Sequence, residues 1–217
     1  MSDNRAALAV KSPFEVLDAH LHFVHGVIAR RVQESIAVKQ SLLGAALVDA
    51  IARLCDVVVD SVRAGGKVIL FGNGGSAADA THIAAEFVGR FAFDRDPMPA
   101  LSLSDNVSAI TAIGNDYAYD LTFSRQLKAL GSSGDVAIGL STSGSSANVL
   151  NALRVAREKQ IFSAAFTGAK GAEMAALADL AVMIPSAATA RIQEGYMLSA
   201  HIMCEVVEQT LFGLRVL

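Results

Sequence analysis

The segment from residue 68 to residue 86 constrains the fold of this chain most, because it combines a strand, a glycine turn and a helix. Val68 to Phe71 is a short apolar run of strand-forming residues that follows the chain-breaking pair Gly65-Gly66. Glycines at positions 72, 74 and 75 then permit a tight turn with positive φ. Ser76 comes directly after this turn and is expected to cap the helix that follows.

A glycine turn that leads from a strand into a helix N-terminus forms a ready anion site, because unpaired backbone N–H groups point out of it. Asn73, Gly74, Gly75 and Ser76 are therefore candidate phosphate-binding residues. The run is neither a GxGxxG motif nor a phosphate-binding loop that ends in Gly-Lys-Ser/Thr. An ordinary tight connection between strand and helix is the alternative.

Two titratable residues follow on the same predicted helix. His82 and Glu86 have the spacing i, i+4, which places both side chains on one helical face. They form a candidate acid–base pair, roughly two helical turns from the anion site.

A second candidate anion site lies in a loop rich in hydroxyl groups. The run Ser-Thr-Ser-Gly-Ser-Ser at residues 141–146 stands where a predicted strand, residues 135–140, leads into a predicted helix. Hydroxyls and backbone N–H groups at a helix N-terminus can hold a phosphate without any lysine. An ordinary serine-rich loop with an N-cap is the alternative, but five hydroxyl residues in six positions favour phosphate.

Strands and helices alternate along the chain after residue 65, which predicts a doubly wound parallel α/β sheet flanked by helices. Further strands are predicted at residues 100–103, 161–166 and 180–184, and helices at 107–113, 115–130, 149–159, 171–177 and 188–212. Before them, two helices at residues 14–39 and 41–63 are expected to form a hairpin. The prediction is therefore an N-terminal helical extension over residues 1–64 and one α/β domain over residues 65–217.

Composition excludes several classes of protein. The net charge of −3 gives no electrostatic reason to expect nucleic acid or an anionic membrane as a partner. The sequence shows no signal-peptide core and no apolar run of membrane-spanning length. Two isolated cysteines do not make a disulfide framework, so a reducing cytoplasm is the expected location.

Histidines also occur on two other predicted helices, the first and the last. His20, His22 and His25 suggest a metal site, but positions 20 and 22 point apart on a helix, so surface or subunit-packing roles are favoured. Gln193, Glu194 and His201 stand out on the last helix. On residue chemistry alone, a lone helical histidine of this kind is more often a packing residue than a catalytic one.

Three motifs in order resemble the sugar isomerase (SIS) domain family, and within it the phosphoheptose isomerases. They are residues 72–86, the hydroxyl-rich run 141–146 and Arg191-Ile-Gln-Glu194. The resemblance implies a five-stranded parallel sheet and a homotetramer with active sites at subunit interfaces. It also implies conversion of sedoheptulose 7-phosphate to D-glycero-D-manno-heptose 7-phosphate, a step of heptose biosynthesis.

The same resemblance assigns residue roles. The phosphate would be held by Ser76, Ser141, Thr142, Ser143 and Ser146. Arg90, Asn115 and Asp116 would contact the sugar or organise the pocket. Glu86 would be the catalytic base and His201 the acid, which suits an enediol reaction that needs one of each. Some relatives bind zinc, and the matching positions here are His82, Glu86, Gln193 and His201.

The zinc set meets a geometric objection. Gln193 and His201 lie about 12 Å apart along a straight helix, whereas two ligand atoms of one ion lie only about 4 Å apart at most. Either the helix begins after Gln193, or the two residues serve different sites, or they reach one ion from different subunits.

Two departures from the family pattern leave the exact substrate open. Ala190 stands where relatives carry Asp, and Tyr196 stands where relatives often carry His. One alternative is an isomerase of another phosphosugar, because the hydroxyl-rich loop contacts only the phosphate. Another is a regulatory SIS protein that binds a replication-initiator partner, a branch that the tail from Glu194 to Phe212 resembles. That regulatory branch lacks the acid–base pair, so Glu86 and His201 favour an enzyme.

Overall fold

The computed structural model describes the backbone of residues 13–213 and the side chains of residues 20–213. The chain divides into two compact units between Ala37 and Val38, inside the first helix. The helices are α1 (Pro13–Ser41), α2 (Ala45–Arg63), α3 (Gly75–Val88), α4 (Val107–Asp116), α5 (Thr122–Leu130), α6 (Ala147–Glu158), α7 (Ala172–Leu177) and α8 (Thr189–Phe212), with a short 3-10 helix η1 (Tyr119–Leu121). The strands are β1 (Val68–Gly72), β2 (Ala100–Ser102), β3 (Val136–Ser141), β4 (Phe162–Gly168) and β5 (Leu180–Ile184).

The strands form one five-stranded parallel sheet in the order β2-β1-β3-β4-β5, which confirms the predicted architecture. The order reverses between β1 and β3, and sheets of this order bind ligands outside the carboxyl ends of the strands at that switch point. Gly72 at the end of β1 pairs with Leu140 near the end of β3. The glycine turn and the hydroxyl-rich loop therefore leave the sheet side by side.

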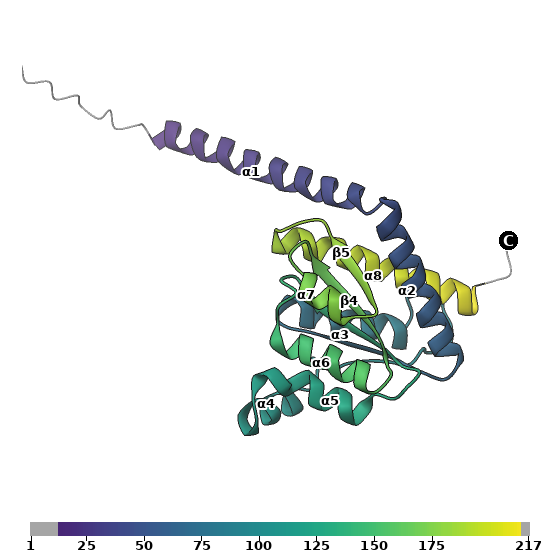
Figure 1. The fold of residues 1–217 in the computed structure, drawn as a ribbon. Helices are drawn as coiled ribbons and strands as arrows, with labels where there is room; N and C mark the ends of the chain where they lie inside the picture. Colours follow the sequence, from purple (N-terminus) through teal and green to yellow (C-terminus); the bar gives the residue numbers. More distant parts are fainter. Residues whose placement is uncertain (1–12, 214–217) are drawn as a thin grey trace, which may run out of the picture. The chain divides into compact units, whose positions relative to one another are not determined.

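Alternate residues of the central strands face two helical layers. Val68 and Leu70 of β1 pack with α2, α3 and α8, whereas Ile69 and Phe71 pack with α5, α6 and α7. Figure 1 shows the sheet between these layers. The strands are buried on both faces, which explains why β1 reads as a continuous apolar run rather than as an alternating one.

Helix α2 belongs to the larger unit. Its residues Ile51, Leu54 and Val58 are buried in the same cluster as residues of α8 and β5. The predicted boundary between residues 64 and 65 therefore differs from the division after Ala37, because α2 contributes to the core instead of forming part of a separate extension.

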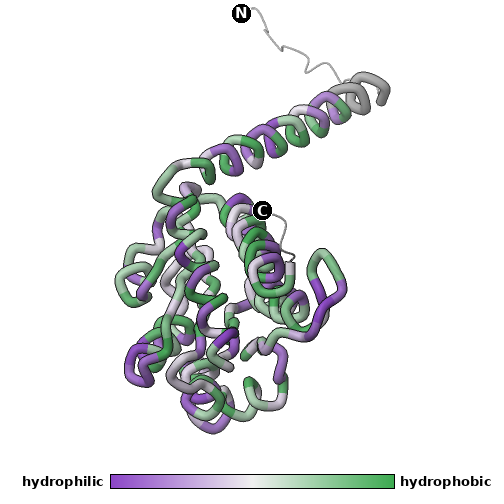
Figure 2. Tube along the Cα trace, turned by 90° about the vertical axis from the view of Figure 1, so that its right-hand side faces the viewer, coloured by the Kyte–Doolittle hydropathy of each residue, from purple (hydrophilic) through white to green (hydrophobic). Residues whose placement is uncertain are grey.

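Helix α1 exposes several apolar side chains. Apolar and polar residues alternate along it (Figure 2), and its large exposed apolar residues are Leu21, Phe23, Ile28, Val32 and Ile36. Residues 1–12 of the predicted N-terminal extension lie outside the described residues. Within residues 13–213, no helix combines the length and the apolar character that crossing a bilayer requires.

Three predicted helix boundaries are wrong. The helix predicted from residue 115 begins only at Thr122, after η1. The second helix begins at Ala45 rather than at residue 41, because α1 continues to Ser41 and a turn over residues 42–44 follows it. Gly114 does not end the helix that begins at Val107. A glycine weakens a helix without compelling a stop, and Tyr117 still donates its backbone N–H to the Ile113 carbonyl.

Both cysteines are buried and their thiols are held in the protonated form. Burial raises the pKa of the Cys55 thiol to about 11 and that of the Cys204 thiol to about 12. Because the thiolate is the reactive form, we expect neither cysteine to react with iodoacetamide in the folded protein near neutral pH. Both should react after unfolding in guanidinium chloride, as measured by mass spectrometry. Rapid labelling of the folded protein would contradict the buried positions.

Candidate active site

The glycine turn reverses the chain at Gly74, which has a φ of 55°. At Gly72, a Cβ would lie 2.8 Å from the Cβ of Ser76 and 2.9 Å from the carbonyl oxygen of Leu140, so no larger residue fits. Helix α3 begins at Gly75 with Gly74 in the cap position, and the predicted N-cap role of Ser76 is wrong. The first N–H groups of α3 have no partner within the helix, so the backbone of the turn offers donors to an anion.

Asn73 fastens the glycine turn to α6. Its side-chain amide exchanges two hydrogen bonds with Asn148, at 2.8 and 2.9 Å, and its Oδ1 also accepts from the hydroxyl of Tyr119 at 2.8 Å. Asn148 is buried and donates to Thr122 as well. The structure therefore shows the amide of Asn73 engaged in holding the turn, whereas its predicted contact with substrate stays a prediction.

The hydroxyl-rich loop clusters its side chains at the carboxyl end of β3. The Oγ of Ser141 lies 3.4 Å from that of Ser143 and 3.1 Å from that of Ser146. Ser146 occupies the cap position of α6, and its hydroxyl contacts that of Ser141 instead of capping a backbone N–H. Thr142 and Ser143 line a cavity of about 420 Å³. The geometry is that of an anion cradle at a helix N-terminus.

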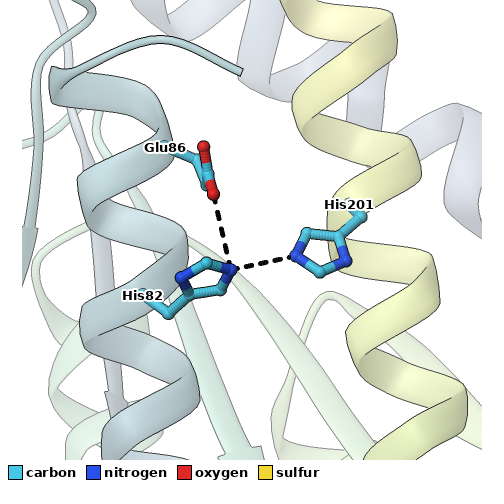
Figure 3. Close-up of side chains that lie close together, drawn as sticks. All are labelled: His82, Glu86 and His201. Atoms are coloured by element: carbon cyan, nitrogen blue, oxygen red, sulfur yellow. Dashed lines mark hydrogen bonds and ion pairs between the residues drawn. The ribbon is translucent and has the colours of Figure 1, made fainter. Parts of the chain in front are cut away.

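His82 and Glu86 of α3 meet His201 of α8 in one cluster (Figure 3). The Nε2 atom of His82 lies 3.1 Å from Nε2 of His201 and 3.4 Å from Oε1 of Glu86. Each of the three residues offers one ligand atom, and these atoms lie within 4.8 Å of one another. Among residues 20–213 this is the one group of His, Cys, Asp and Glu side chains with the spacing of a metal site.

A buried ion pair holds the loop that follows α3 against α8. Arg95 donates to Oε1 of Glu208 at 2.9 Å, and the two side chains are 1% and 0% exposed. Glu208 also accepts the backbone N–H groups of Phe91 and Ala92. The ring of Phe91 stacks on His201 with centroids 5.8 Å apart. Arg95 donates further to the backbone carbonyl of Glu86 at 2.8 Å, so the pair connects both helices that carry the His82–Glu86–His201 cluster.

Gln193 lies apart from the cluster within this chain. Helix α8 begins at Thr189 and so includes Gln193, which excludes the possibility that the helix starts after it. The Nε2 of Gln193 donates to Oδ2 of Asp79 at 2.6 Å. A Cβ on Gly75 would lie 2.9 Å from that nitrogen, so the Gln193 amide lies against the glycine turn. Two explanations of its predicted metal role remain: Gln193 and His201 serve different sites, or they reach one ion from different subunits.

Three further predicted residues lie on the surface. Arg90 is exposed after the end of α3, and Asn115 and Asp116 are exposed at the end of α4, where Asn115 donates to the Asp116 carboxylate at 2.8 Å. In the described part of the chain, no hydrogen bond joins any of the three to the His82–Glu86–His201 cluster. Their predicted contacts with the sugar stay predictions.

The N-terminal histidines do not form a metal cluster with the required spacing. His20, His22 and His25 are exposed on α1. Among residues 20–213, the group of side chains with the spacing of a metal site includes none of them.

The structure adds Lys170 and Asn148, which sequence reasoning missed. Lys170 lines the same 420 Å³ cavity as Thr142 and Ser143. Its position two residues after β4, at the carboxyl edge of the sheet, is the signal that would have found it. Asn148 follows the hydroxyl-rich loop, but no local pattern shows that its partner is Asn73, 75 residues earlier.

Comparison with known proteins defines the class. A family model described as "SIS domain" matches residues 33–168, so the fold and the two loops are those of a SIS-domain protein. A phosphoheptose isomerase of Burkholderia pseudomallei is 50% identical over 187 residues, which cover 84% of this chain and 95% of the relative. One of Sulfurimonas denitrificans is 47% identical over 86% of this chain and 96% of its own. The chain belongs to the phosphoheptose isomerase family.

Solved structures agree with this assignment. The structure of a phosphoheptose isomerase from Neisseria gonorrhoeae has a TM-score of 0.81 at 40% identity and covers 86% of this chain and 99% of its own. One from Francisella tularensis has a TM-score of 0.82 at 32% identity, with 86% of this chain and 98% of its own covered.

Proposed function

We propose that this protein converts sedoheptulose 7-phosphate to D-glycero-D-manno-heptose 7-phosphate in the cytoplasm, as an early step towards heptose sugar nucleotides. One observation carries the proposal: His82, Glu86 and His201 converge about two helical turns from the glycine turn, in a chain that is 50% identical to a protein named phosphoheptose isomerase. Ketose–aldose isomerisation moves a proton between adjacent carbons and needs one base and one acid. The cluster supplies both.

The phosphate group would bind at the switch point of the sheet. The hydroxyls of Ser141, Thr142, Ser143 and Ser146 and the backbone N–H groups of the glycine turn are donors, and phosphate oxygens are acceptors. Lys170 adds a cation in the same cavity. Arg90, Asn115 and Asp116 keep their proposed role towards the sugar.

Glu86 is proposed as the base that takes the proton from carbon and returns it to the neighbouring carbon. Its carboxylate lies 3.4 Å from His82, and its side chain is 23% exposed, so it is partly shielded from water yet reachable. His201 is proposed as the acid that serves the carbonyl and hydroxyl oxygens. The Phe91 ring stacked on it fixes the plane of the imidazole.

The same three residues fit a zinc ion. Two ligand atoms on a tetrahedral ion with bonds near 2.0 Å lie about 3.3 Å apart. Two of the three separations here are 3.1 and 3.4 Å, and the third, between Glu86 and His201, is within 4.8 Å. His82, Glu86 and His201 would hold the ion and leave a fourth position open, as in catalytic zinc sites. A zinc-bound Glu86 or His201 is not free to exchange a proton, so the zinc site is an alternative to the acid–base pair described above. Bound there, zinc supplies Lewis-acid stabilisation of negative charge on a substrate oxygen.

We also infer a homotetramer with active sites at subunit interfaces, as the family resemblance implies. An apolar groove of about 360 Å³ between α2 and α8 supports association between copies. Leu43, Val48, Ile202 and Val206 line it and are exposed. Apolar patches of this kind mark interaction surfaces in soluble proteins.

The test is turnover of sedoheptulose 7-phosphate by the purified protein, after chelation and again after addition of zinc. We expect product formation to fall on chelation and to return with zinc, with about one equivalent of zinc per chain by mass spectrometry. Activity that is unchanged by chelation would support the isomerase function and exclude a catalytic role for zinc. Absence of turnover under both conditions would contradict the proposed function.

A further inference from the structure

Tyr196 lies at the centre of a buried chain of hydroxyl groups. Its side chain is wholly buried, and its Oη lies 3.0 Å from Oδ2 of Asp79 and 2.8 Å from Oγ of Ser76. The contact connects α8 to the first turn of α3, directly behind the glycine turn. Ser76 is buried, with 8% of the residue exposed, at the start of α3.

The direction of each hydrogen bond follows from counting hydrogens. A carboxylate only accepts, so the single hydroxyl hydrogen of Tyr196 goes to Asp79. Burial raises the pKa of Tyr196 far above its ordinary value, so the phenol keeps that hydrogen. The contact between Ser76 and Tyr196 must then use the hydrogen of Ser76. The Oγ of Ser76 is left with lone pairs and no hydrogen to offer a ligand.

We propose that Tyr196 is a positioning residue that makes the Ser76 hydroxyl an acceptor, so that Ser76 contacts a hydroxyl group of the sugar and not the phosphate. Phosphate oxygens near neutral pH need donors, and a second set of lone pairs repels them. The backbone N–H of Ser76 still serves the anion. The inference rests on the proposed sugar-phosphate substrate, and it replaces the predicted phosphate role of the Ser76 side chain.

Gln193 adds a second acceptor next to Ser76. Its Nε2 donates one of its two hydrogens to the same Asp79 oxygen at 2.6 Å, so the amide keeps the carbonyl acceptor Oε1 and one N–H donor. The amide lies against Gly75, one residue before Ser76. Two acceptors thus stand at the glycine turn, where hydroxyl donors of a polyol match them, while the hydroxyl-rich loop supplies donors for the phosphate.

The test compares two ligands by titration calorimetry: inorganic phosphate, and the phosphorylated heptitol obtained by reducing the ketose, which cannot isomerise. Ser76→Ala should weaken heptitol phosphate about 3- to 10-fold, the effect of one hydrogen bond, and leave inorganic phosphate unchanged. Tyr196→Phe frees the Ser76 hydrogen, so it should weaken heptitol phosphate and leave inorganic phosphate equal or tighter. Ser143→Ala should weaken both ligands, and Tyr117→Phe, at an exposed tyrosine, should change neither.

Equal weakening of both ligands by Ser76→Ala would overturn the inference, because it would show Ser76 donating to the phosphate. Wild-type affinities in Ser76→Ala would overturn it as well, and this variant removes only one oxygen, so a folding defect is not expected to mask the result. Wild-type protein that binds heptitol phosphate no tighter than inorganic phosphate would also overturn it. All these readouts are independent of turnover, so failure of the proposed isomerase activity is seen separately.

Discussion

Replacing Glu86 with glutamine is expected to abolish most turnover while the protein stays folded. Glutamine keeps the shape of the side chain but cannot take a proton from carbon. General acid–base catalysis contributes about 10²- to 10⁴-fold, so kcat should fall by roughly that factor. KM should change little, because the base acts in the transition state and not in the binding of substrate.

Steady-state kinetics, with zinc content measured on the same sample, separates two explanations of a low rate. Loss of kcat with zinc retained supports Glu86 as the base, whereas loss of kcat together with zinc assigns Glu86 to the metal. The matched control is Glu158→Gln, at a carboxylate that is 66% exposed and lies outside the cluster. Normal turnover in Glu86→Gln would show that another group removes the proton.

Replacing Arg95 with methionine is expected to destabilise the folded protein strongly. It leaves the carboxylate of Glu208 buried without its cationic partner, which costs about 3–5 kcal/mol. In a chain of 217 residues, each kcal/mol lowers the midpoint of thermal unfolding by about 2–4 °C. Differential scanning calorimetry of the variant and the parent protein measures this shift.

Two variants control this experiment. Adding Glu208→Gln to Arg95→Met removes the unpaired charge, so the double variant should unfold at a higher temperature than Arg95→Met alone. Arg154→Met breaks an exposed pair with Glu173, 49% and 61% exposed, and should shift the midpoint little. A shift from Arg95→Met no larger than that from Arg154→Met would contradict the importance of the buried pair.

Acid should act on the same pair. Burial alone raises the pKa of Glu208, but the backbone N–H groups of Phe91 and Ala92 and the guanidinium of Arg95 outweigh it and hold that pKa below its usual value. The ionised carboxylate therefore stabilises the fold at pH values above the unfolded-state pKa. This stabilisation is lost as pH falls through the lower pKa of the folded state.

The sequence could predict those parts of the site that have a recognisable pattern within a few neighbouring residues. The glycine turn after β1, the hydroxyl-rich loop after β3 and the i, i+4 pair His82 and Glu86 each carry a local pattern, and parallel topology brings the first two together. His201 carries no such pattern. Only the resemblance to a known family identified it, since one histidine on a helix has no distinctive spacing.

The remaining contacts were beyond prediction because they depend on how α8 lies across α3. Ser76 and Tyr196 are 120 residues apart, and Arg95 and Glu208 are 113 apart. Neither pair is visible as a motif, and a buried glutamate within an apolar helical stretch reads as an ordinary helix former. The partner of Gln193 could not be predicted for the same reason. It is Asp79 on α3, 114 residues earlier, and not one of the other predicted metal ligands.

Helix α8 carries Gln193, Tyr196, His201 and Glu208, all of which contact α3 or the loop after it. Insertion of one residue between positions 196 and 201 would rotate everything beyond it by about 100° and advance it by about 1.5 Å. His201 and Glu208 would then leave their partners together. Homologous chains should therefore differ in length at the turns around residues 131–134 and 185–188, while the interval from Gln193 to Glu208 keeps one fixed number of residues.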